Sequence, residues 1–255
     1  MRGLLAVLGV AFALSLAAVP VFAAEEAEEP LERDWPHIGL FGTYDRAALQ
    51  RGYRVYKDVC SACHSLKYIS FRNLIEIGFT EAEAKAVASE FSFEAGPSEE
   101  TGEMFDRAGL LSDTFPRPYA NDAEARLSNN GALPPDLSLM AKAREDGTNY
   151  VFSLLVGYEE APDDFDLTDG MNYNHYFAGL QIAMPQPLFE DMVEYRDGTP
   201  ATVEQMAADV TQFLAWTAEP SLEPRHRMGF QVMVFLILLT ILLYFVKRKV
   251  WADVH

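Results

Sequence analysis

The sequence has very few cysteines. Cys60 and Cys63 are the only two among 255 residues, and they lie three positions apart. A structural zinc site takes four nitrogen or sulfur ligands, usually from clustered cysteines and histidines. The histidines outside this segment are scattered without ligand spacing: His37, His175, His226 and His255. The composition therefore argues against a zinc site.

Basic residues are also scarce. The chain has 20 Lys and Arg against 38 Asp and Glu, a formal net charge of −18. Residues 1–23 contain one basic residue, and the chain after Pro224 contains five basic residues and one acidic one. The segment 24–224 therefore carries −23. Such a charge repels nucleic acid and suits either a basic partner or solubility alone.

We find no internal repeat, no low-complexity run and little strand pattern. The length suits one domain with extensions. Caps and apolar periodicity predict mainly helical structure, with residues 94–119 and 158–187 as loops. The first expected helix starts at Thr43 or Asp45. Two further helices follow capping boxes at Thr80–Glu83 and Thr202–Gln205, and shorter helices are expected over residues 71–77, 121–128 and 148–156.

Two long apolar runs lie near the ends of the chain. Residues 1–23 are typical of a cleaved bacterial signal peptide, with Arg2 before an apolar run and a small-residue cleavage site. Residues 229–246 carry no charge and are long enough for one transmembrane helix. We expect a periplasmic domain at 24–220, a stiff linker at 221–228 with Pro224, and a cytoplasmic tail at 247–255. This places the protein in a bacterial inner membrane.

The segment Val59-Cys60-Ser61-Ala62-Cys63-His64 contains the most specific motif of the sequence. Cys-x-x-Cys-His is the attachment pattern for a c-type haem, since thiols three residues apart on a helical turn share a face. Both can form thioethers to one porphyrin, and His64 can ligate the iron. A redox-active dithiol is the alternative, but it is typical of a strand–helix context, and the preceding residues have a helical pattern.

The iron of a haem bound by His64 has a second axial position, and the ligand there affects what the haem can do. A methionine thioether favours electron transfer over oxygen chemistry. Met184 is the best candidate, because prolines at 185 and 187 stiffen its loop. Met140 and Met206 lie on predicted helical faces and are typical core residues, whereas Met171 lies in a Gly/Asn-rich loop.

The chain resembles the cytochrome c1 family over nearly its whole length after the leader. The resemblance rests on these segments: RGYRVYKDVCSACHSL at 51–66, RLSNNGALPPDLSLMAKAR at 126–144, NYVFSLLVGY at 149–158, IAMPQPL at 182–188, YRDGTPATVEQMAADVTQFLAWTAEP at 195–220, and the anchor ending in KRKVW. It implies a class I cytochrome c-like haem domain with long loop insertions and one C-terminal transmembrane helix.

The resemblance also implies the site. One haem c is attached through Cys60 and Cys63, His64 and Met184 are its axial iron ligands, and Arg144 and Tyr150 approach its propionates. From the sequence alone, Arg144 would be an exposed residue at a helix end. A carbonyl at Pro134 or Pro135 is expected to accept the His64 ring N–H. Some bacterial members have an extra disulfide, which this chain cannot form.

The implied function is electron transfer without catalysis of bond chemistry. The haem would take electrons from a Rieske iron–sulfur protein and pass them to a soluble, basic c-type cytochrome, within a quinol–cytochrome c reductase complex that contains cytochrome b and is expected to be a dimer. The alternative is a membrane-tethered cytochrome that feeds a terminal oxidase or reductase. Candidate docking charges are Glu94, Glu99, Glu100, Glu103, Asp163, Asp164, Glu190, Asp191 and Glu194.

Overall fold

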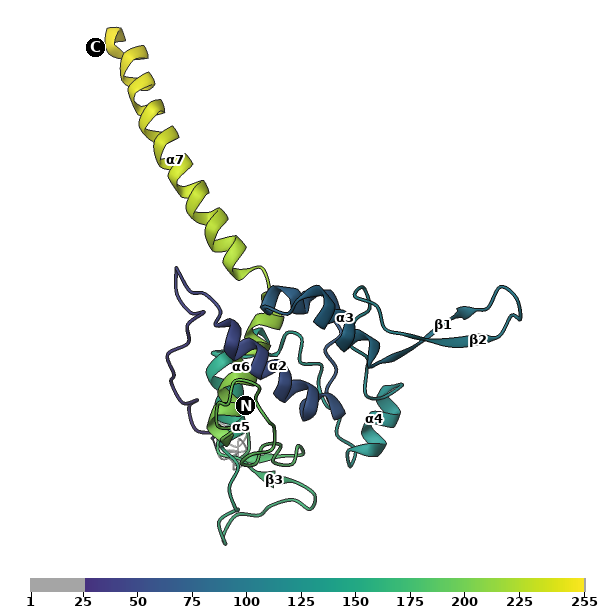
Figure 1. The fold of residues 1–255 in the computed structure, drawn as a ribbon. Coiled ribbons are helices and arrows are strands. Elements are labelled where there is room, and N and C mark those ends of the chain that lie inside the picture. Colours follow the sequence, from purple (N-terminus) through teal and green to yellow (C-terminus); the bar gives the residue numbers. More distant parts are fainter. Residues whose placement is uncertain (1–25, 255) are drawn as a thin grey trace, which may run out of the picture.

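A computed structural model describes residues 26–254 of the chain. The predicted signal peptide, residues 1–23, lies outside the described residues. Within them the structure is mainly helical, which confirms the predicted class (Figure 1). The helices are α2 (Arg46–Asp58), η1 (Cys60–Ala62), η2 (Phe71–Ile77), α3 (Glu81–Ser89), α4 (Asp122–Ser128), η3 (Met140–Lys142), α5 (Gly147–Val156), α6 (Val203–Ala218), α7 (Leu222–Val250) and η4 (Ala252–Val254).

The packing of α2 against α6 forms the centre of the head. The Asp45 carboxylate caps α2 by accepting the N–H groups of Ala47 and Ala48, which identifies Asp45 as the cap. Tyr53 and Tyr56 each lie 5.8 Å, between ring centroids, from Phe213 on α6. These rings belong to the main buried cluster, so burial of apolar surface fixes the two helices against each other.

Gly52 makes this crossing possible. A Cβ atom at this position would lie 2.1 Å from the Asp209 carbonyl oxygen and 2.7 Å from the Phe213 Cβ. The backbones of α2 and α6 therefore approach too closely for any side chain at residue 52. The end of α2, which leads into the two cysteines, is held firmly against the core.

The prediction of a loop over residues 94–119 was wrong in part. Strands β1 (Ser92–Pro97) and β2 (Met104–Ala108) pair as an antiparallel hairpin. Gly96 and Pro97, which suggested a loop, lie at a register shift where a bulge accommodates them. Figure 1 shows this hairpin extending from the head as an arm.

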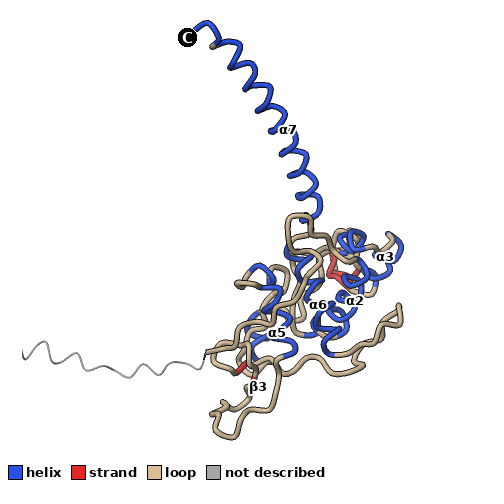
Figure 2. Tube along the Cα trace, turned by 90° about the vertical axis from the view of Figure 1, so that its left-hand side faces the viewer, coloured by secondary structure: helices blue, strands red, loops and turns tan. Residues whose placement is uncertain are grey.

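The second predicted loop region is largely irregular, as expected. It contains only two short paired strands, β3 (Asn172–Tyr173) and β4 (Gln181–Ile182). Figure 2 shows that long loops make up much of the head around α5 and β3. The fold class with long insertions therefore agrees with the structure.

The expected linker at 221–228 is helical from Leu222 onward, and α7 is one continuous helix. Pro224 falls in the first turn, where a backbone N–H has no intrahelical acceptor and proline is tolerated. Among the described residues, α7 is the one helix long and apolar enough to cross a membrane. Its apolar side chains are exposed, and Figure 1 shows it projecting from the head.

The other predicted helix boundaries agree with the structure to within a residue or two. The Thr80 and Glu83 side chains form the predicted capping box of α3. The box predicted at Thr202 is only half formed: Thr202 accepts the Gln205 N–H, but the Gln205 amide donates to Asp209 instead. Residues 71–77 form a 3-10 helix, which ends at Gly78 with φ of 101°.

Candidate functional site

A single 3-10 turn joins α2 to the histidine of the Cys-x-x-Cys-His motif. The N–H groups of Cys63 and His64 both donate to the Cys60 carbonyl, at 3.1 and 2.9 Å. Side chains at i and i+3 eclipse one another in a 3-10 helix. The half-buried thiols of Cys60 and Cys63 are therefore on one side of the turn, as covalent attachment to one porphyrin requires.

The His64 ring is oriented by a backbone carbonyl. Its Nδ1 lies 2.8 Å from the Pro135 oxygen. A carbonyl can only accept, so Nδ1 carries the hydrogen and Nε2 keeps its lone pair. This confirms the expected contact between the His64 ring and the Pro134–Pro135 segment.

Asp136 fixes the loop that supplies this carbonyl. Its Oδ2 accepts the Ser65 hydroxyl at 2.7 Å and the Lys67 N–H at 3.0 Å, while its Oδ1 accepts the Ser138 N–H at 3.0 Å. The Leu137 N–H also donates to the Ser65 carbonyl at 2.9 Å. These bonds hold residues 135–138 against 65–67 and so fix the acceptor of the His64 hydrogen.

Burial favours the neutral form of the His64 imidazole. It lowers the pKa of His64, and the Pro135 hydrogen bond and the charge of Asp136 offset part of this effect. A neutral ring with one N–H already bonded has one nitrogen free to ligate a metal. The environment of His64 therefore suits an iron ligand.

Met184 lies half-buried in the segment after β4. The Tyr158 hydroxyl donates to the Met184 carbonyl at 3.1 Å. Burial raises the pKa of Tyr158, and the neighbouring Tyr150 raises it further. Tyr158 thus links the backbone of Met184 to Tyr150, which is close enough to affect the pKa of Tyr158.

The structure brings the predicted site residues together in two groups and leaves one outside. The first contains Cys60, Cys63 and His64, and the second contains Tyr150 and Met184, which are linked through Tyr158. Arg144 is exposed, and its guanidinium donates to the carbonyl of its neighbour Ala143 at 3.1 Å. The propionate role of Arg144 and Tyr150, which follows only from the resemblance, stays a prediction.

Two residues that position the site were missed from the sequence. Asp136 follows two prolines and accepts the N–H two residues on, which is a common Asp turn pattern and could have identified it. Tyr158 has no local pattern of this kind. Its partner lies 26 residues away and is determined by tertiary packing.

The Cys60 thiol does not have the environment of a reactive redox cysteine. Burial raises the pKa of the Cys60 thiol to about 12, and the nearby Cys63 adds to the rise. Thiol–disulfide oxidoreductases activate their attacking cysteine by lowering this pKa. The structure therefore favours haem attachment over the dithiol alternative.

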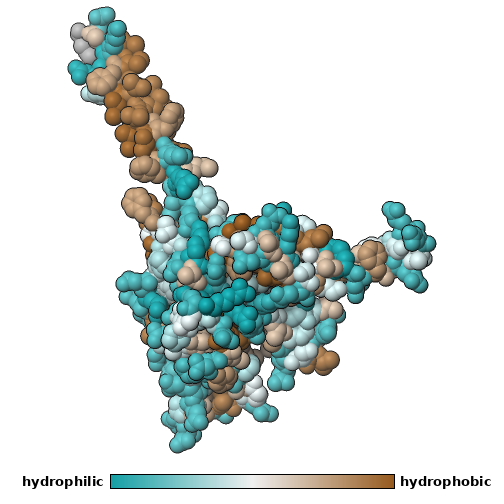
Figure 3. All heavy atoms as spheres, in the orientation of Figure 1, coloured by the Kyte–Doolittle hydropathy of each residue, from teal (hydrophilic) through white to brown (hydrophobic). Residues whose placement is uncertain are grey.

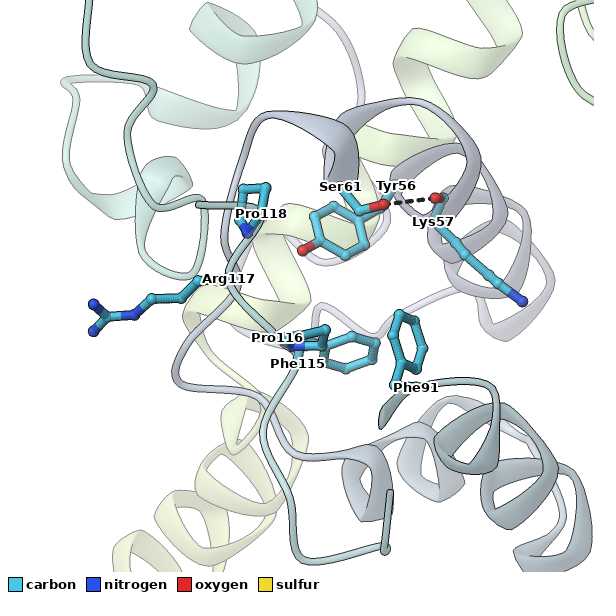
Figure 4. A pocket seen from close by; sticks show the side chains of 8 residues that line it. All are labelled: Tyr56, Lys57, Ser61, Phe91, Phe115, Pro116, Arg117 and Pro118. Atoms are coloured by element: carbon cyan, nitrogen blue, oxygen red, sulfur yellow. Dashed lines mark hydrogen bonds between the residues drawn. The ribbon is translucent and has the colours of Figure 1, made fainter. Parts of the chain in front are cut away.

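A small hollow lies beside the turn that carries Cys60 and Cys63 (Figure 4). Its volume is about 70 Å³, and its lining residues are Tyr56, Lys57, Ser61, Phe91, Phe115, Pro116, Arg117 and Pro118. In Figure 4 the Arg117 side chain points away from it, and Ser61 donates to the Lys57 carbonyl at 2.7 Å. This volume holds a few waters and is too small for a porphyrin.

Comparisons with known proteins agree with the predicted family. The cytochrome C1 family model matches residues 35–254. "Cytochrome c1 1, heme protein, mitochondrial" of Arabidopsis thaliana is 48% identical over 97% of this chain and 81% of its own length. "Cytochrome b-c1 complex catalytic subunit, mitochondrial" of Candida albicans is 47% identical over 94% of this chain and 83% of its own.

A bacterial relative is similar to this chain over part of its own length. "Cytochrome b/c1" of Bradyrhizobium diazoefficiens is 47% identical over 91% of this chain but only 37% of the relative. The family match covers both the attachment turn and the apolar helix α7. The family model that matches residues 35–254 and the relatives of 47–48% identity show that this chain belongs to the cytochrome c1 family.

Proposed function

We propose that this chain is the haem-bearing, electron-transfer subunit of a cytochrome bc1 complex. Cytochrome c1 proteins are the haem subunit of that complex, an electron-transfer component, and family membership supports the same role here. In this proposal one haem c is attached through Cys60 and Cys63, with His64 and Met184 as axial ligands. The subunit itself breaks and forms no bonds in the quinol reaction.

The observation that carries this proposal is the hydrogen bond from His64 Nδ1 to the Pro135 carbonyl. It fixes the tautomer in which Nε2 is free, and ring orientation of this kind is what a metal-ligating histidine requires. The nearby thiols share a side of one turn, and the described chain offers a methionine in a stiff loop. This set of donors fits a haem iron.

The bound haem would supply a one-electron Fe(III)/Fe(II) couple. The chain's own residues would keep the geometry constant between the two states. The Asp136 loop holds the His64 ring, and Tyr158 holds the backbone of Met184. Fixed ligands change position little on reduction, so little reorganisation opposes electron transfer.

Cytochrome b is the partner that the relatives' names support most directly, since two of them name it together with c1. We propose in addition a Rieske iron–sulfur protein as electron donor and a basic soluble cytochrome as acceptor. The proposed location is a bacterial inner membrane, with the head in the periplasm and α7 as anchor. Copurification with a b-type cytochrome and an iron–sulfur protein separates this from a tethered cytochrome that feeds an oxidase.

Substitution of Met184 tests the ligand assignment. In Met184→Leu we expect the haem to remain covalently attached, as a pyridine haemochrome spectrum of denatured protein would show. The native iron should lose its low-spin spectrum and its high reduction potential, because a thioether stabilises the ferrous state.

Met171→Leu is the matched control, since Met171 is also half-buried in a loop. It should leave spectrum and potential unchanged. If Met184→Leu behaves like Met171→Leu, the axial ligand lies elsewhere. A colourless protein produced with a c-type maturation system would overturn the haem proposal itself.

A further inference from the structure

The segment just before α2 exposes large apolar side chains. Leu40 and Phe41 are each 77% exposed and Ile38 is 62% exposed. Residues 35–44 contain no Asp, Glu, Lys or Arg, although the surrounding segment 24–224 carries −23. We call residues 38–41 the apolar loop. It is an uncharged patch on a strongly acidic head.

This loop is held in a defined shape. The Gly42 N–H donates to the Gly39 carbonyl at 3.2 Å, and the Thr43 N–H donates to the Pro36 carbonyl at 2.9 Å, which closes the loop at its base. His37 is buried below it and stacks on Tyr44 with ring centroids 5.4 Å apart. Exposure of the apolar side chains is therefore built into the fold.

The residues that directly follow the loop are bonded to the first turns of α7. The His226 Nδ1 lies 3.3 Å from the Gly42 carbonyl, and the Glu223 carboxylate accepts the Tyr44 N–H at 2.8 Å. Arg46 forms an ion pair with the same carboxylate at 2.6 Å. In Figure 1 the segment before α2 rises toward the side from which α7 leaves the head. The apolar loop thus has a fixed position along the α7 axis.

That position corresponds to the surface of a bilayer. The uncharged part of α7 starts at Met228, two residues after His226, which is about 3 Å along a helix. The polar interfacial layer on each side of the hydrocarbon is about 5–8 Å thick. A loop whose base at Gly42 is bonded to His226 lies within this layer, where apolar and aromatic side chains are stabilised. Figure 3 shows the apolar surface of α7 next to a hydrophilic head.

We propose that the apolar loop inserts into the membrane interface beside α7, as a second contact between the head and the lipid. The inference rests on α7 being the membrane anchor. Lipid is the favoured partner because the base of the loop, at Gly42 and Tyr44, is bonded to the anchor at interfacial depth. The acidic head cannot be drawn to an anionic membrane by charge, and this uncharged loop is the part suited to touch it.

Spin-label accessibility tests the proposal on the full-length haem protein in vesicles of phosphatidylcholine with a minor fraction of phosphatidylglycerol. Nitroxides are placed by Leu40→Cys and Phe41→Cys. Leu127→Cys on α4 is the matched control, since Leu127 is an 87% exposed leucine on the part of the head away from α7 (Figure 1). Val234→Cys marks the span. We expect the ratio of oxygen to nickel-complex accessibility to be severalfold higher at 40 and 41 than at 127.

Equal ratios at 40, 41 and 127 would overturn the proposal, and so would an aqueous ratio at Val234. If labels at 40 and 41 are aqueous in the isolated chain and are shielded from both reagents only in the complex, a partner protein covers the loop instead. Unsubstituted protein is treated in parallel. Label on Cys60 or Cys63 there would count against the thioethers and leave the result for the loop intact.

Discussion

Asp209 is a fully buried carboxylate at the crossing of α2 and α6. Arg51 donates two hydrogen bonds to it, at 2.9 and 3.0 Å, and the Gln205 amide donates a third at 3.0 Å. Arg51 also reaches Asp197 at the surface, at 2.8 Å. Hydrogen bonding to Asp209 is the main cause that raises the pKa of Arg51. The pair orients the two helices beside Gly52.

Removal of this carboxylate should therefore cost stability. Asp209→Ala leaves the largely buried Arg51 without its main partner, and we expect the free energy of unfolding to fall by about 3 kcal/mol. Urea denaturation of the haem protein in detergent, followed by circular dichroism, measures it. The matched control is Asp197→Ala, because the Asp197 side chain is 44% exposed and solvent screens its pairing. A control loss as large as that of Asp209→Ala would contradict this account.

At the scale of elements, the β1–β2 hairpin is fastened at its base by one ion pair. The Arg107 guanidinium donates to both oxygens of Asp113, at 2.6 and 2.8 Å, and the Leu110 N–H donates to the same carboxylate at 2.8 Å. The hydrogen bonds from Arg107 lower the pKa of Asp113 most, and the Leu110 N–H is the next cause. Together they lower it to about 2. The Asp113 carboxylate therefore stabilises the base of the hairpin only while it is ionised.

This gives a pH dependence with a definite sign. The folded-state pKa lies below the ordinary value of 3.8, so the stabilisation is complete above pH 4 and is lost as the pH falls toward 2. Hydrogen exchange of amides in residues 92–113, corrected for intrinsic rates, should accelerate over this interval. Asp113→Asn should already exchange fast at pH 5 and change little below it. Unchanged protection in the unsubstituted protein at pH 2 would refute the role of Asp113.

Elements with local signals were predictable, and those that depend on distant contacts were not. Thr80 marked the start of α3, and Asp45 was one of two caps predicted for α2, because an N-cap acts on the next three residues. The hairpin was missed because Gly96 and Pro97 usually break strands, and the bulge that admits them needs a partner strand. The start of α7 was missed because Pro224 breaks a helix except in its first turn.

The same distinction applies to the candidate site. The Cys60, Cys63 and His64 motif is local, and its spacing was enough to predict haem attachment. The contact between His64 and Pro135 spans 71 residues, and only the family resemblance suggested it. Nothing near Tyr158 in the sequence indicates that its hydroxyl donates to Met184.

At the scale of the whole molecule, charge is separated from the apolar anchor. The predicted docking acids are all exposed, and four of them lie on the β1–β2 hairpin or its turn: Glu94, Glu99, Glu100 and Glu103. Figure 3 shows the end of this arm as hydrophilic. The arm therefore presents negative charge well away from the core, where it can act on an approaching basic protein.

Electron transfer to a basic soluble cytochrome should consequently depend on ionic strength. The screening length falls from about 30 Å at 0.01 M salt to about 8 Å at 0.15 M, so we expect the second-order rate constant to drop steeply. Stopped-flow oxidation of the reduced protein measures it. A variant with Glu99, Glu100 and Glu103 changed to Gln should have a shallower salt dependence at unchanged reduction potential. A flat response in the unsubstituted protein would exclude electrostatic docking.

The junction between α6 and α7 has a consequence for the whole assembly. Only Glu219, Pro220 and Ser221 separate the two helices, and Leu222 is already buried in the head. Glu219 pairs with Lys142 and Arg225, and its carbonyl accepts the Tyr44 hydroxyl at 3.1 Å. The head is thus held rigidly at the end of α7 and is not joined to it by a flexible linker. Any redox centre in the head therefore stays at a fixed distance from the membrane surface. Its electron donors and acceptors must move to reach it.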